Sequence, residues 1–186
     1  MAGKKYDKYI LSGPRPWNPP GTGPIVAYLD DQVNDKAYAG SLQYYVHWVP
    51  VRPQGLPGVS SWEQMGHGPH KHKTPETVMH LGTDPDNPLD LGGEVEFYLG
   101  PELEKHVLTT SNLVYLPADF IHGPWIIKKV TRPFIMVTVE QSPRHTEKSY
   151  QDLVSGEDRD NLLFIDQGYE SEERIIKLAK RMAREW

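Results

Sequence analysis

The 186 residues contain no cysteine. Disulfide bonds, thiolate metal ligands and a cysteine nucleophile are therefore excluded. A chain without disulfides is compatible with a reducing compartment, and we expect a cytoplasmic protein.

Excess basic charge and long apolar runs are lacking as well. The 20 lysines and arginines face 25 acidic residues, so the net charge is -5, which argues against a nucleic-acid-binding surface. No apolar stretch reaches the length of a transmembrane helix, and residues 1–9 are polar without the apolar segment of a secretory signal. We therefore expect neither nucleic acid nor a membrane among the partners.

Proline and glycine, by contrast, are abundant, with 17 prolines and 16 glycines. They indicate many turns, as a β-barrel needs, and the length fits one domain. Alternating β-prone segments predict strands over residues 25–29, 41–51, 76–81, 93–99, 103–108, 113–116, 125–127 and 134–140. Shorter patterns predict further strands over residues 5–11 and 59–65.

A histidine-rich segment in the middle of the chain has the residues of a metal site. Side chains alternate along a strand, so His70 and His72 face the same side, and a turn containing Pro75 brings Glu76 back to it. Two imidazoles and one carboxylate suit a divalent first-row metal ion. A distant strand would supply the fourth ligand, and His122, which follows a proline turn, is the candidate.

These residues resemble the two sequence motifs of the cupin superfamily. The pattern His-x-His-x-x-x-Glu, followed by Gly82, is similar to the first motif, and Pro117 with His122 is similar to the second. The resemblance spans roughly residues 40 to 140 and implies an all-β double-stranded β-helix, the cupin jelly-roll barrel. It also implies that the barrel holds one divalent transition metal ion on four side chains, those of His70, His72, Glu76 and His122.

The second motif departs from the usual cupin pattern at two positions. Glycine is usual where Asp119 stands, so the tight turn there must be made differently. The asparagine often found after the histidine is replaced by Ile126. Neither departure affects the four expected ligands.

Outside the barrel, assigned to residues 41–140, we expect an N-terminal arm with the first strands over residues 1–40 and a C-terminal extension over 141–186. The proline-rich segment 13–21 excludes helix, and we expect an extended arm anchored by Trp17. Ser171, acidic residues after it and an apolar stripe predict a helix over residues 170–186. Because cupins commonly pair through sheet edges, we expect a homodimer in which these extensions take part.

Strand alternation also selects candidate catalytic groups, namely Tyr45, His47 and His80. The alternative for His47 is a place on the solvent face or a local hydrogen bond. The alternative for His80 is a core histidine whose hydrogen bonds are satisfied by the protein. Three further residues are candidates for lining the substrate pocket, which by its aromatic character suits a small organic substrate: Tyr98, His106 and Trp125. His67 is expected to support the ligands or to face solvent.

The expected ligands give three neutral nitrogens and one carboxylate. Iron(II) is the first expectation, and manganese, nickel, cobalt and zinc are compatible. Four protein ligands leave two positions of an octahedral ion open for substrate and for water or dioxygen. The first hypothesis is therefore an Fe(II)-type dioxygenase acting on a small oxygenated organic substrate.

Two other functions remain open from the sequence. A lyase or isomerase would use manganese, nickel or zinc as a Lewis acid, with His80 or Tyr45 as the base. A non-catalytic cupin would bind a small molecule without turnover. The fold alone does not choose between these functions.

Overall fold

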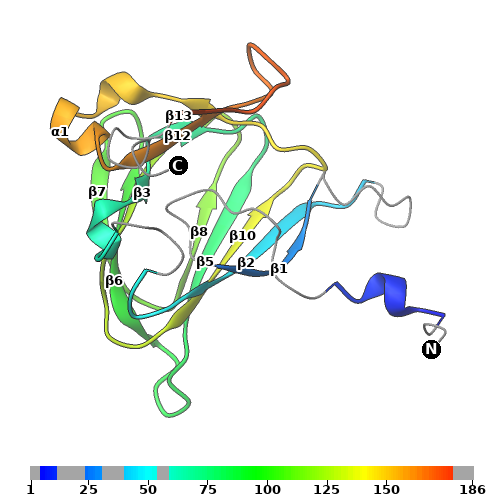
Figure 1. Ribbon diagram of the computed structural model, residues 1–186, viewed down its shortest axis with the longest axis vertical. Helices are drawn as coiled ribbons and strands as arrows, with labels where there is room; N and C mark the ends of the chain where they lie inside the picture. The colour runs from blue at the N-terminus through cyan, green and yellow to red at the C-terminus, as the bar shows by residue number, and fades with distance from the viewer. Residues whose placement is uncertain (1–4, 12–23, 31–39, 54–58, 178–186) are drawn as a thin grey trace.

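Two antiparallel sheets face each other and form a barrel (Figure 1). The computed structural model describes residues 5–11, 24–30, 40–53 and 59–177. The first sheet has the strand order β1-β2-β10-β5-β8, and all of its pairs are antiparallel. Its strands are β1 (Ile25–Leu29), β2 (Gln43–Val49), β10 (Phe134–Glu140), β5 (Glu76–Gly82) and β8 (Asn112–Leu116).

The second sheet is built around β9 (His122–Val130). One edge of β9 pairs with β6 (Asp90–Leu99), which in turn pairs with β7 (Glu104–Thr110). The other edge pairs with the short strands β3 (Gly66–His67) and β4 (His70–Lys71). The C-terminal extension completes this sheet with β11 (Lys148–Ser149), β12 (Leu162–Asp166) and β13 (Ile175–Lys177).

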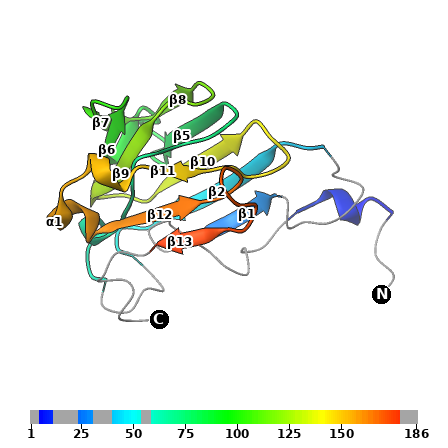
Figure 2. The same cartoon turned by 90° about the horizontal axis from the view of Figure 1, so that it is seen from above.

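The C-terminal extension therefore belongs to the barrel wall. Strand β12 pairs with β3, and this is the one parallel pair among the described strands. Figure 2 shows β12 and β13 running alongside the barrel. The remaining short elements are η1 (Asp7–Tyr9), η3 (Trp62–Gln64), η4 (Gln151–Leu153) and α1 (Gly156–Arg159).

The alternation of side chains along each strand determines which of them point into the barrel. On β10 the inward side chains run from Phe134 through Met136 and Thr138 to Glu140, and the neighbouring strands follow the same order. Phe134 lies in an apolar core, whereas Glu140 is paired across the strands with Gln43 and with Glu76. One end of the barrel is thus packed with apolar side chains, and the other end is polar.

Most of the expected strands are confirmed, but three expected elements are wrong. Residues 59–65 contain η3 instead of a strand, because Gln64 closes a capping box with Ser61. Residues 5–11 contain η1 instead of an edge strand. The helix over 170–186 does not form in its described part, where residues 175–177 are strand β13. Residues 178–186 and the proline-rich segment with Trp17 lie outside the described residues.

Candidate metal centre

Four side chains, from residues between positions 70 and 122, meet inside the polar end of the barrel. His70 lies on β4, His72 follows it, Glu76 begins β5 and His122 begins β9. Their donor atoms lie within 4.8 Å of one another, and all four residues are buried. The backbone pairing of His70 with His122 and the turn at Pro75 bring these positions together. The structure thus assembles the set that the sequence indicated.

Hydrogen bonds to backbone carbonyls fix the orientation of each imidazole. The Nδ1–H of His70 donates to Gly68 O at 2.7 Å, that of His122 donates to Phe120 O at 3.0 Å, and that of His72 donates to Thr146 O. Each ring consequently directs its Nε2 to the interior. Second partners of this kind are usual for metal-binding histidines because they fix the tautomer.

Two of the inward-facing ring nitrogens have no hydrogen-bond partner among the described residues. Nε2 of His72 and Nε2 of His122 are buried and have no hydrogen-bond partner. They lie 3.4 Å and 3.1 Å from Oε2 of Glu76, which also carries lone pairs. Buried acceptors that face one another need a cation between them. The donor set therefore fits a divalent metal ion.

Electrostatics favour a cation at this position. Burial would raise the pKa of Glu76, but the charge of His72 and the adjacent ring of His122 hold it well below its usual range. Burial would lower the pKa of His72, but Glu76 raises it to about 10. A metal ion would replace the proton that His72 otherwise binds. Burial and the neighbouring histidines lower the pKa of His70, so it stays neutral and able to act as a ligand.

The turn before His122 is made by an aspartate in a left-handed conformation. Asp119 has φ +59°, and its backbone N–H donates to His72 O at 2.8 Å. Aspartate tolerates this region better than most residues that have a Cβ. Its carboxylate also forms an ion pair with Lys71 at 2.7 Å. This explains how the second motif forms without the usual glycine.

The chain has the cupin fold. This follows from the two facing antiparallel sheets and from the place of the two motifs inside them. The cupin barrel here extends beyond residue 140, because residues 148–149 and 162–166 pair with its strands. Among the described residues, no helix has the length and apolarity that crossing a membrane requires.

The similarities between this chain and known proteins are low. No protein-family model matches the sequence, and no curated protein matches it. An uncharacterized conserved protein with a double-stranded β-helix domain from Klebsiella pneumoniae is 16% identical, with 80% of this chain and 96% of that chain covered and a TM-score of 0.41.

Two enzymes are also among the similar structures. Oxalate decarboxylase from Lactobacillus farciminis is 13% identical, with 76% of this chain and 34% of that chain covered and a TM-score of 0.44. A DMSP lyase from Ruegeria pomeroyi is 18% identical, with 59% and 43% covered and a TM-score of 0.36. At this level of similarity, neither an activity nor a ligand passes from these proteins to this chain.

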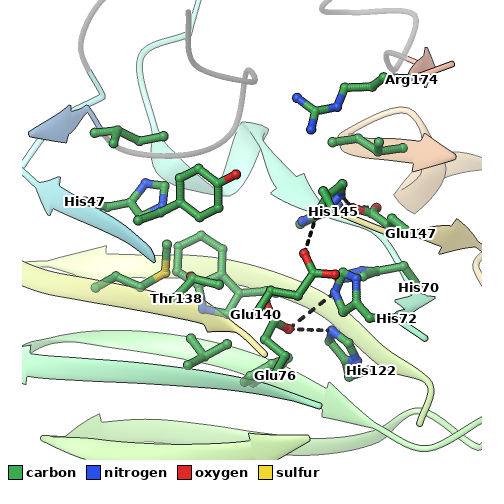
Figure 3. Close-up of a pocket in the computed structure, with 18 residues that line it drawn as sticks. His47, His70, His72, Glu76, His122, Thr138, Glu140, His145, Glu147 and Arg174 are labelled. Atoms are coloured by element: carbon green, nitrogen blue, oxygen red, sulfur yellow. Dashed lines mark hydrogen bonds and ion pairs between the residues drawn. The ribbon is translucent and has the colours of Figure 1, made fainter. Parts of the chain in front are cut away.

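A cavity of about 140 Å³ lies beside the four donor atoms (Figure 3). Tyr45 and His47 line it, and His47 is buried, so its expected alternative on the solvent face is wrong. Trp125 lines it as expected. His67 also lines it, stacks on the ring of His70 at 4.1 Å, and therefore supports a ligand as the sequence suggested.

Three other candidates do not belong to the cavity. His80 is fully buried, its Nδ1–H donates to Asn112 Oδ1 at 3.0 Å, and its Nε2 accepts from the indole of Trp125 at 2.9 Å. With both nitrogens hydrogen-bonded, it matches the alternative of a core histidine satisfied by the protein. Tyr98 donates to Glu96, and His106 pairs with Glu104 on the exposed strand β7. Neither residue lines the cavity.

A second polar group in the cavity was missed from the sequence. His145 lies between two buried carboxylates, with Nδ1 2.8 Å from Glu140 and Nε2 3.2 Å from Glu147. Glu147 also accepts from His67 at 2.7 Å. Both ring nitrogens of His145 face carboxylate oxygens, so both carry protons and the ring is an imidazolium. Burial opposes that charge, but Glu140 and Glu147 raise the pKa of His145.

The sequence contained a signal for only one member of this group. Glu140 continues the inward series of Met136 and Thr138, which marks it as a buried carboxylate. His145 and Glu147 follow the last barrel strand, and they enter the cavity because Glu147 pairs with Gln167 of the returning extension. No local pattern shows that pairing.

A glycine next to His122 gives the first testable prediction. Gly123 has φ +86°, and a Cβ there would lie 2.6 Å from the carbonyl oxygen of Gly68, which accepts the hydrogen bond of His70. We expect Gly123→Ala to lower the free energy of unfolding by roughly 2–5 kcal/mol, as measured by urea denaturation. Gly156→Ala is the control, because a Cβ there meets nothing within 4 Å. Equal midpoints for Gly123→Ala and the wild type would contradict this expectation.

Proposed function

We propose that this cupin is a metal-dependent enzyme that catalyses proton transfer on a small oxygen-bearing organic molecule, as lyases and isomerases do. One observation carries the proposal: the imidazolium of His145 and its two carboxylates line the same cavity as the four donor atoms. A site that only bound metal for stability would need neither the cavity nor this charged group.

The chain's own residues have distinct tasks in this proposal. His70, His72, Glu76 and His122 would hold a divalent ion, which acts as a Lewis acid on a substrate oxygen. His145 is the proton donor. Its contact with Glu147 is the longer of its two, so the proton on Nε2 is the one that it releases more easily.

The neighbours of His145 allow that proton to be replaced. Glu147 bonds both His145 and His67, and 21% of the His67 side chain is exposed. Protons can therefore reach His145 from solvent through His67 and Glu147. Glu140 keeps the ring in place, and its other oxygen accepts from the backbone N–H of Thr146 at 3.0 Å.

The test is hydrogen exchange into substrate carbon positions. The metal-loaded protein is incubated in D₂O with a panel of small hydroxy and oxo compounds, both charged and neutral, and followed by NMR. We expect exchange into at least one compound, with manganese or zinc, and a loss of roughly 100-fold or more in His145→Gln with metal content unchanged. His106→Gln, on exposed strand β7, is the matched control. Exchange that survives in His145→Gln would contradict the assigned role.

The Fe(II) dioxygenase is the second candidate. It is supported by the number of protein ligands, since four leave two positions of an octahedral ion open for substrate and dioxygen. It predicts oxygen uptake with iron and none with zinc, whereas proton transfer predicts product under argon. Binding of a panel compound with neither exchange nor oxygen uptake would favour the non-catalytic cupin.

The homodimer expected from the sequence remains a proposal, and the sheet faces supply a surface for it. The outer face of the first sheet is apolar and partly exposed, and includes Trp48, Ile135 and Leu81 in one cross-strand row. Sheets pack face to face about 10 Å apart, so a second copy of the same face would bury these side chains.

We expect sedimentation of the wild type as a dimer at micromolar concentration and of Leu81→Lys as a monomer. The substitution places a charge in the middle of the proposed interface. Val107→Lys is the control, because Val107 is similarly exposed but lies on β7, outside that sheet. A monomeric wild type would refute the dimer.

A further inference from the structure

We infer that the cavity binds a small carboxylate-bearing molecule, with its carboxylate on Arg174 and a second oxygen directed toward the donor atoms of His70, His72, Glu76 and His122. This inference rests on the proposed function and adds the class of substrate to it. It assigns a role to Arg174, which the sequence patterns did not single out.

Arg174 enters the cavity from the C-terminal extension. It precedes β13 and is among the side chains that line the cavity. Figure 3 shows its guanidinium directed over the cavity, on the side away from Glu76 and His122. A ligand between them would therefore contact the guanidinium at one end and the metal site at the other.

Neighbouring residues hold this guanidinium in one orientation. Its Nε–H donates to Oε1 of Gln167 at 2.6 Å. The backbone of Gln167 is in turn paired with that of Glu147 by two hydrogen bonds of 2.8 Å each. Within the described residues, neither terminal nitrogen of Arg174 has a hydrogen-bond partner of its own, and a planar pair of N–H donors matches the two oxygens of a carboxylate.

Another partly buried arginine, Arg132, has carboxylate partners within the protein. Arg132, at the opposite end of the barrel, forms ion pairs with Asp84 at 3.1 Å and with Asp90 at 2.7 Å. In the part of the chain that the structure describes, no carboxylate forms an ion pair with Arg174. A charged group at a cavity wall without a protein counter-ion is suited to an anionic ligand.

Size and wall chemistry limit the ligand further. The cavity of about 140 Å³ is close to cavities that hold a molecule of about six heavy atoms. Apolar side chains form much of the remaining wall, and they favour a short hydrocarbon portion between the polar ends: Ile25, Val78, Phe97, Met136 and Ile165. Small 2-hydroxy and 2-oxo monocarboxylates have this composition.

Calorimetry with a matched pair of probes tests the inference. Lactate and lactamide have nearly the same shape but differ in charge, and each is titrated into protein loaded with one equivalent of Co(II). We expect the wild type to bind lactate roughly 10- to 100-fold more tightly than lactamide. Arg174→Gln should abolish this preference without changing lactamide affinity or Co(II) content, and Arg174→Lys should keep part of it.

Controls separate this inference from the proposed function. Arg144→Gln removes an exposed arginine that does not line the cavity and should leave the preference unchanged. A lactate preference that persists in Arg174→Gln, or no lactate binding by the wild type, overturns the inference. If the wild type fails to bind Co(II), the metal-dependent function fails, and the same titrations on metal-free protein still decide whether Arg174 binds the carboxylate. A Co(II) absorption spectrum unchanged by bound lactate would overturn the placement of the second oxygen.

Discussion

Protein purified with Glu76→Ala is expected to contain only a small fraction of the metal that the wild type carries, which should be near one equivalent per chain. Glu76 is the one carboxylate among the four donors, and its Oε2 lies within 3.4 Å of Nε2 of both His72 and His122. Its removal leaves three neutral imidazoles and an uncompensated divalent charge in a buried site. Since loss of a supporting residue alone weakens metal binding 10- to 100-fold, we expect about 100-fold or more here.

Elemental analysis of dialysed protein, together with competition against a chelator, measures this effect. His72→Ala should behave in the same way. Glu104→Ala is the matched control, because this glutamate is exposed and pairs only with the exposed His106 in the described structure. Full metal content in both Glu76→Ala and His72→Ala would mean that the ion binds elsewhere.

Replacing His145 by leucine is expected to lower the free energy of unfolding at pH 7 by about 3–5 kcal/mol. The variant keeps Glu140 and Glu147 buried but removes the cation that lies between them. Removal of one partner from a buried charged group is strongly destabilising for this reason. Urea denaturation measures the change, and His106→Leu, at an exposed ion pair, should have almost no effect.

The pH dependence of this loss has a defined sign. In the wild type, His67 and His145 hold the pKa of Glu147 well below its ordinary value although burial opposes them, so its contribution is present above about pH 4.5 and is lost as the pH falls through the lowered pKa. The pKa of His145 is raised, so its contribution is complete below about pH 6.5 and is lost as the pH rises through the raised pKa.

In His145→Leu, Glu147 remains buried but loses its hydrogen bond with His145, so the pKa of its carboxyl lies higher than in the wild type. The variant should therefore recover stability as the pH falls from 7 to 5, and the difference from the wild type should narrow. A difference that stays constant over this range would show that the loss comes from packing and not from charge.

Strand alternation predicted most of the strands, whereas the barrel and its set of four donor residues came from the resemblance to the cupin motifs. The alternation over 76–81 places Glu76 and Val78 on one inward face, and the spacing of His70, His72 and Glu76 allows them to share one side of the chain. The same alternation places His80 inside the barrel. It did not reveal that His80 lies toward the apolar end of the barrel, where it is hydrogen-bonded to Asn112 and Trp125. That position depends on how far each strand is shifted along the barrel axis, which alternation does not show.

Residues after the barrel motifs were predicted less well. The segment 170–177 has an apolar and basic pattern that suits a helix, but residues 175–177 pair with β12 and form a strand. Ladder hydrogen bonds with a neighbouring strand outweighed the local helix propensity. Because the path of this segment was wrong, His145, Glu147 and Arg174 were not placed in the cavity.

The carbonyl of Thr146 accepts the hydrogen bond that orients His72. All four donor side chains precede residue 123, whereas His145, the proposed proton donor, and Arg174, the proposed carboxylate-binding residue, follow residue 140. In the proposed function, the residues that would hold the ion and the residues that would act on the bound molecule thus come from different parts of the chain. The Thr146 carbonyl connects these two parts. Substitutions within residues 141–177 are therefore expected to change the substrate or the reaction without changing the four donor residues, provided that a main-chain acceptor for His72 is preserved.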